Sequence, residues 1–96
     1  MPSYRVTMTI GTLRPTVDPK SVLPAAVAAA EEFTTVEASG LAIVRGAPRI
    51  IVRFLADDTE LAAQIGGHVA ASTGRLAEIP TWKITAREGG RWYPNV

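Results

Sequence analysis

Apolar and polar residues alternate near the start of the chain, and this period of two constrains the fold more than any other feature. The apolar positions share one parity: Tyr4, Val6, Met8 and Ile10. The polar positions share the other parity: Arg5, Thr7 and Thr9. Successive side chains of a strand point to opposite faces, so this run is typical of a strand with one buried face. The alternation returns in residues 49–56 and 82–87, which predicts an open β-sheet.

Two segments with helical periodicity lie between these runs. The first follows Ser21, which we expect to be its N-cap, because Pro24 then falls in the first turn, where its missing N–H is not needed. The second follows Asp57, the expected N-cap, with Glu60 three residues later as in a capping box. At the end of the second helix, Gly74 suits a left-handed C-terminal residue.

The pattern of residues 36–45 predicts a further strand, but apolar residues occur at both its odd and its even positions and so on both of its faces. Leu41 and Ile43 take one parity, whereas Val36 and Val44 take the other. A strand that is apolar on both faces is usually covered on both. An outer strand of a monomer would not be covered in this way, so we expect a homodimer. A Gly/Pro turn at residues 45–48 joins this strand to residues 49–56 as a hairpin.

The elements follow the order β-α-β-β-α-β, which is the split pattern of the ferredoxin-like fold. We therefore expect residues 1–96 to form a single α+β domain, a two-layer sandwich with both helices on one face of an antiparallel sheet. The expected strand order in that sheet is 4-1-3-2. Gly89 and Gly90 predict a turn into a short extra strand at the C-terminal end.

Composition excludes several classes of function. The chain has 96 residues, a net charge of +1 and no cysteine, so a disulfide framework and an iron–sulfur cluster are ruled out. The sequence shows no signal segment and no apolar run long enough to span a membrane, so we expect a cytoplasmic protein. No glycine-rich nucleotide motif is present, and His68 is the single histidine. We therefore expect no cofactor and no metal, and we interpret His68 as a residue at the edge of the core.

Half of the ten cations share one parity across three predicted strands. These residues are Arg5, Arg49, Arg53, Lys83 and Arg87. Neighbouring strands would place them on the sheet face away from the helices, where they could hold an anionic ligand. Three interpretations of this face stay open: a solvated surface, a self-association face and a nucleic-acid platform. We expect no aromatic side chain on it, which argues against the nucleic-acid platform.

Apolar residues outside the expected core are candidates for an interface. In the sheet these are Leu41, Ile43 and Ile51. Trp92 and Tyr93 follow the last strand, where they either pack back on the domain, as a hairpin would allow, or meet a partner.

The sequence predicts a non-enzymatic binding or interaction module, homodimeric and of undefined ligand. The alternative is a module that binds nucleic acid or another polyanion through the basic face. The third candidate is a tautomerase-like enzyme, in which removal of Met1 would free the secondary amine of Pro2. The start of the chain and the rough order of elements are the extent of that resemblance.

Overall fold

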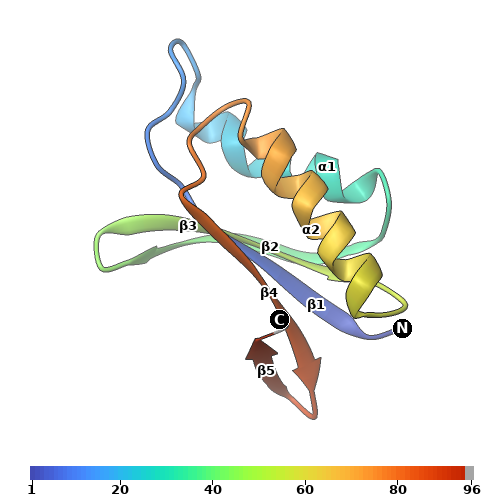
Figure 1. Cartoon of the computed structure of the whole chain (residues 1–96). Coiled ribbons are helices and arrows are strands. Elements are labelled where there is room, and N and C mark those ends of the chain that lie inside the picture. Colours follow the sequence, from blue (N-terminus) through green and yellow to red (C-terminus); the bar gives the residue numbers. More distant parts are fainter. Residues whose placement is uncertain (95–96) are drawn as a thin grey trace.

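The computed structural model describes residues 1–94 as one antiparallel sheet with two helices on one of its faces (Figure 1). The strands are β1 (Ser3–Thr9), β2 (Val36–Val44), β3 (Ala47–Leu55), β4 (Thr81–Glu88) and β5 (Arg91–Pro94). The helices are α1 (Val22–Glu31) and α2 (Thr59–Thr73), and a short 3-10 helix, η1 (Pro19–Ser21), leads into α1. Neither helix is long and apolar enough to cross a membrane.

The five strands lie in the order β2-β3-β1-β4-β5, and every neighbouring pair is antiparallel. This order differs from the expected four-stranded 4-1-3-2 sheet, because β5 pairs with the outer side of β4 as a fifth strand. The extra strand predicted after the glycine pair is thus present. Gly89 and Gly90 have φ angles of 55° and 89°, which a two-residue turn between twisted strands requires.

The core lies between the helices and one face of the sheet. The apolar parity of β1 is buried as predicted, and Tyr4 stacks on Phe54 of β3 with ring centroids 6.2 Å apart. Small residues of α2 let the helix approach β4 closely. A Cβ added to Gly66 would lie 2.3 Å from Cδ1 of Ile84, so this approach depends on glycine.

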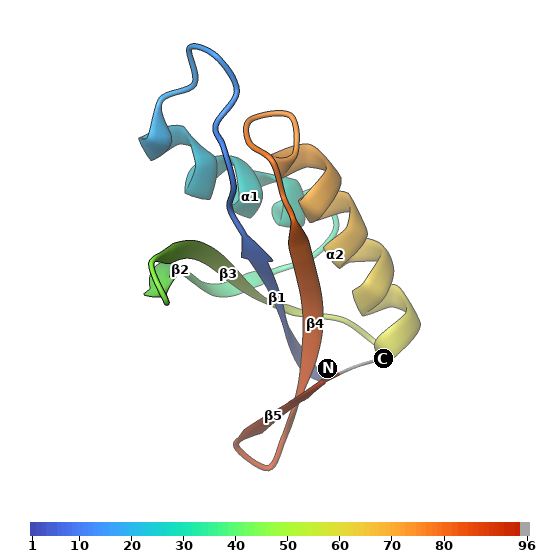
Figure 2. The ribbon, with the colours of Figure 1, turned by 60° about the vertical axis from the view of Figure 1, so that its left-hand side comes forward.

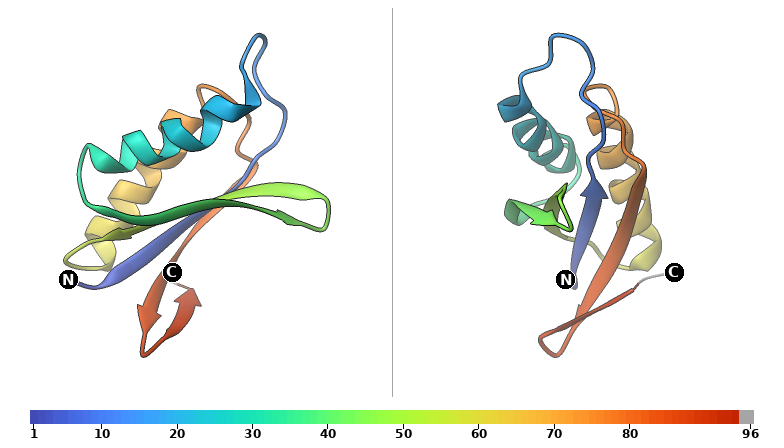
Figure 3. Two further views of the ribbon diagram at one scale, coloured as in Figure 1. Left: turned by 180° about the vertical axis from the view of Figure 1, so that it is seen from behind. Right: turned by 90° about the vertical axis from the view of Figure 1, so that its left-hand side faces the viewer.

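The β2–β3 hairpin extends beyond the helices (Figures 1 and 3). Its two-residue turn consists of Arg45 and Gly46, both with positive φ. Leu41 and Ile43 lie opposite Ile50 and Pro48, on the helix side of the sheet. Leu41 borders a shallow pocket together with Val22 and Leu23 at the start of α1, yet it is still 60% exposed, and Ile43 is 65% exposed. Residues 1–94 therefore leave most of these two side chains uncovered.

Two expectations about the helix ends are wrong, and a third is confirmed in position only. Asp58, and not Asp57, is the N-cap of α2, since its Oδ1 accepts a hydrogen bond of 2.8 Å from the backbone N–H of Leu61. Ser21 precedes α1 as predicted, but its side chain makes no capping hydrogen bond to that helix. Gly74 has a φ of −60° and is not left-handed, because the chain continues into a further helical turn.

Candidate anion-binding groove

A groove of about 590 Å³ runs across the sheet face opposite the helices. The strands that form this face are strongly twisted relative to one another (Figure 2). We call the concavity the basic groove; its lining residues are Arg5, Thr7, Ala38, Ser39, Gly40, Ala42, Val44, Arg49, Ile51, Arg53, Lys83, Thr85 and Trp92. None of these residues is acidic.

Four of the five cations that the sequence placed on one face line the basic groove. Arg5 comes from β1, Lys83 comes from β4, and Arg49 and Arg53 come from β3. The fifth, Arg87, is not a lining residue and pairs across the strands with Trp92 of β5. Alternation along three adjacent strands thus brings four of the five cations into one groove.

An aromatic residue also lies on this face, contrary to expectation. The guanidinium carbon of Arg5 lies 3.9 Å from the ring centroid of Trp92, within the range of a cation–π contact. The guanidinium of Arg53 lies 5.4 Å from the same centroid. The prediction was wrong because Trp92 reaches the face only through the β4–β5 pairing, which folds the end of the chain back.

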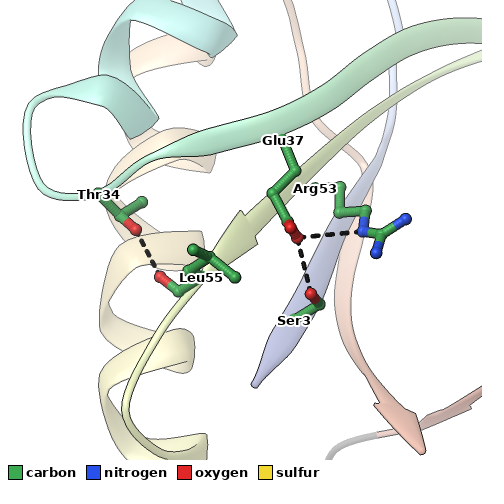
Figure 4. Close-up of polar contacts among 5 residues, drawn as sticks. All are labelled: Ser3, Thr34, Glu37, Arg53 and Leu55. Atoms are coloured by element: carbon green, nitrogen blue, oxygen red, sulfur yellow. Dashed lines mark hydrogen bonds and ion pairs between the residues drawn. The ribbon is translucent and has the colours of Figure 1, made fainter. Parts of the chain in front are cut away.

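One carboxylate borders the groove and is already engaged (Figure 4). Oε1 of Glu37 accepts hydrogen bonds from the hydroxyl of Ser3 at 2.7 Å and from Nε of Arg53 at 3.1 Å. The hydrogen bond from Ser3 is the largest cause that lowers the pKa of Glu37, and the charges of Arg53 and Arg87 lower it further against an opposing effect of burial. Glu37 therefore neutralises Arg53, whereas Arg5, Arg49 and Lys83 form no ion pair within residues 1–94.

A smaller depression of about 140 Å³ lies between Arg49 and Lys83, both of which also line the basic groove. Arg49 is paired with Thr9 of β1 in the sheet register, and Lys83 is paired with Thr7 of the same strand. The two cations thus flank β1 from opposite sides. The hydroxyls of Thr9 and Thr81 lie 3.0 Å apart and hydrogen-bond to each other, and both residues line the depression.

Neither of these two cations has an acidic partner in the part of the chain that the structure describes. The ion pairs found there join Arg53 with Glu37 and His68 with Glu32. Nε of Arg49 is buried and has no hydrogen-bond partner within residues 1–94. The charge of Arg49 is therefore not neutralised by a carboxylate within residues 1–94.

The residues predicted as an interface do not form one patch. Ile51 and Trp92 line the basic groove, whereas Leu41 and Ile43 lie on the opposite face of the sheet. Tyr93 follows Trp92 in β5 and so points to the other side of that strand. Any association surface must therefore use one of these groups and not all five residues together.

Two further candidates lie away from the groove. Pro2 is exposed and does not line the basic groove, and its carbonyl accepts a hydrogen bond of 3.2 Å from the backbone N–H of Ala56. Nε2 of His68 lies 3.1 Å from a carboxylate oxygen of Glu32, and its ring packs edge-on against Phe33 at 4.8 Å. His68 thus lies at the edge of the core, and its partner is the carboxylate of Glu32, the C-cap residue of α1.

Fold and site together define a small α+β domain with a basic, concave sheet face. Comparison of the chain with family models, with curated proteins and with solved structures finds no match in any of the three.

Proposed function

We propose that this chain is a non-catalytic binding module that holds a phosphate-bearing ligand in its basic groove. We further propose that the domain is ferredoxin-like, with β5 as an addition to the β-α-β-β-α-β order. The observation that carries the functional proposal is the pair Arg49 and Lys83, which flank one depression and have no carboxylate partner among residues 1–94.

Phosphate is the anion that suits this depression best. The guanidinium of Arg49 offers a planar fork of donors, and the ammonium of Lys83 adds a compact charge. Hydroxyl donors of Thr7 and Thr9 lie between the two. Two cations with neighbouring hydroxyls favour an anion with several oxygens and more than one negative charge.

The rest of the groove has room for the organic part of such a ligand. Its volume of about 590 Å³ falls within the usual range of small-molecule sites, about 300–1,000 Å³. Ala38, Gly40 and Ala42 of β2 contribute little side-chain bulk to its wall. Trp92 adds an aromatic ring at the β5 end, where the planar part of a ligand can make contact.

Phosphate esters beside planar rings occur both in free nucleotides and in single-stranded nucleic acids. We therefore name adenosine 5′-monophosphate and a single-stranded oligonucleotide as probes, titrated separately by calorimetry. Tight binding of the first assigns a small-molecule ligand. Binding of the second alone assigns a polyanion, which was the alternative predicted from the sequence.

Variants locate the binding. Arg49→Gln and Lys83→Gln should each weaken binding by about tenfold or more, since a hydrogen bond to a charged group contributes about 1.5–3 kcal/mol. Lys20→Gln and Arg75→Gln are the matched controls, because both residues are exposed and lie outside the groove. Equal losses in the controls, or no binding of either probe at about 50 mM salt, would contradict the proposal.

A further inference from the structure

We propose that two copies of this chain pair edge to edge through β2, and that this brings their two basic grooves together on one surface. The first observation is the state of the β2 edge. This strand is nine residues long and lies at the end of the sheet, and β3 is its one strand partner among the described residues 1–94. Residues 38–44 contain no charge and no proline, and such an edge is a template for pairing with another strand.

The opposite edge of the sheet is protected. β5 is four residues long, begins with Arg91 and ends with Pro94. Short length, charge and proline are the devices that prevent edge pairing, and β2 has none of them between residues 38 and 44. Glu37 is the single charge in β2, and it is engaged with Ser3 and Arg53 on the groove side. The two edges therefore differ, and β2 is the one open to a partner.

The second observation is the uncovered apolar surface beside that edge. Leu41 and Ile43 lie on the helix side of β2 and are 60% and 65% exposed. Antiparallel pairing of β2 with the same strand of a second copy would place the same two residues of that copy next to them. Cross-strand apolar pairs of this kind stabilise a sheet, so self-pairing covers the surface that one chain leaves bare.

The symmetry of this pairing has a consequence for the groove. Two antiparallel β2 strands are related by a two-fold axis perpendicular to the sheet, so the helices of both copies lie on one face and the grooves on the other. Ala38, Gly40 and Ala42 of β2 line the basic groove, so the two grooves meet at the new interface. The pair of chains would thus present one continuous basic surface, suited to a ligand longer than one groove.

Mass measurement by sedimentation, without ligand, tests this inference independently of what the groove binds. We expect twice the chain mass of 10.2 kDa for the unmodified protein, and the monomer mass for Leu41→Lys and Ile43→Lys. Both residues are exposed, so circular dichroism should show an unchanged fold. Tyr93→Lys, on the protected edge, is the matched control and should stay dimeric.

Hydrogen exchange provides the second readout. Backbone amides in residues 38–44 should exchange more slowly in the unmodified protein than in Ile43→Lys, because pairing covers the free edge. A monomer mass at the highest soluble concentration would overturn the inference. So would a dimer that survives both β2 variants and dissociates in Phe33→Lys, which would assign the interface to the helix side around α1 and α2.

Discussion

Arg5 of β1 lies over the ring of Trp92 in β5, with 3.9 Å between the guanidinium carbon and the ring centroid. β4 separates these two strands in the sheet, so the contact joins β5 to the centre of the groove across a whole strand. The pair lines the basic groove, and Arg53 lies 5.4 Å from the same ring.

A double-mutant cycle on this pair should show coupling. Arg5→Gln and Trp92→Leu, alone and together, should give an interaction free energy of about 0.5–1 kcal/mol in chemical unfolding. The same cycle with Arg87→Gln in place of Arg5→Gln should give a smaller interaction free energy. Arg87 is paired with Trp92 across the strands, but it makes no cation–π contact with that ring within residues 1–94. Equal coupling in both cycles would contradict the assignment.

Glu37 should make stability depend on pH at the acidic end. Its pKa in the folded chain is held below the ordinary value of 4.5, chiefly by the hydrogen bond from Ser3. The ionised carboxylate therefore stabilises the fold above about pH 4.5, and this contribution is lost as the pH falls through the lowered pKa.

The free energy of unfolding, measured for the unmodified protein and for Glu37→Gln across this pH range, tests the predicted pH dependence. The unmodified protein should be more stable than Glu37→Gln at pH 7, by less than about 1 kcal/mol because the pair is partly exposed. The difference should shrink toward acid, and Ser3→Ala should reduce the pH dependence. If the stability difference between the two proteins instead grew as the pH falls, the predicted stabilisation by ionised Glu37 would be contradicted.

Asp58 caps α2, and its neighbour provides the control. Asp58→Ala should lower the free energy of unfolding by about 1 kcal/mol, because the N–H of Leu61 loses its acceptor. Asp57→Ala removes a carboxylate that makes no such hydrogen bond in the described structure and should have a smaller effect. Thermal unfolding distinguishes the two, and the reverse order would restore the capping box predicted from the sequence.

Two adjacent glycines of α2 should respond differently to alanine. Gly67→Ala should stabilise the protein by up to about 1 kcal/mol through helix propensity, since its added Cβ would lie 3.8 Å from Trp82. Gly66→Ala should be clearly less stable than Gly67→Ala, because its Cβ would meet Cδ1 of Ile84 at 2.3 Å. Adding Ile84→Val to Gly66→Ala should recover part of the lost stability, because it removes Cδ1. If stability is not recovered, a clash with Ile84 is not the cause of the destabilisation.

Alternation in the sequence predicted the basic face because it depends only on parity along β1, β3 and β4. The alternation could not show that Arg53 is paired with a carboxylate whereas Arg49 is not. The partner of Arg53 is Glu37, which lies at a bulge near the start of β2. Trp92 was missed because its place depends on how a glycine turn directs the last strand. The faces of Leu41 and Ile43 likewise depend on the register of β2 against β3.

Amide chemical-shift mapping can locate a phosphate site in the basic groove residue by residue. Adenosine 5′-monophosphate and then a single-stranded oligonucleotide are titrated into ¹⁵N-labelled protein. We expect at least one probe to shift the amides of Thr7, Arg49 and Lys83 most, together with the indole N–H of Trp92, and we expect Arg49→Gln to suppress these shifts. Shifts confined to α1 and α2, or none with either probe at about 50 mM salt, would contradict a phosphate site in the basic groove.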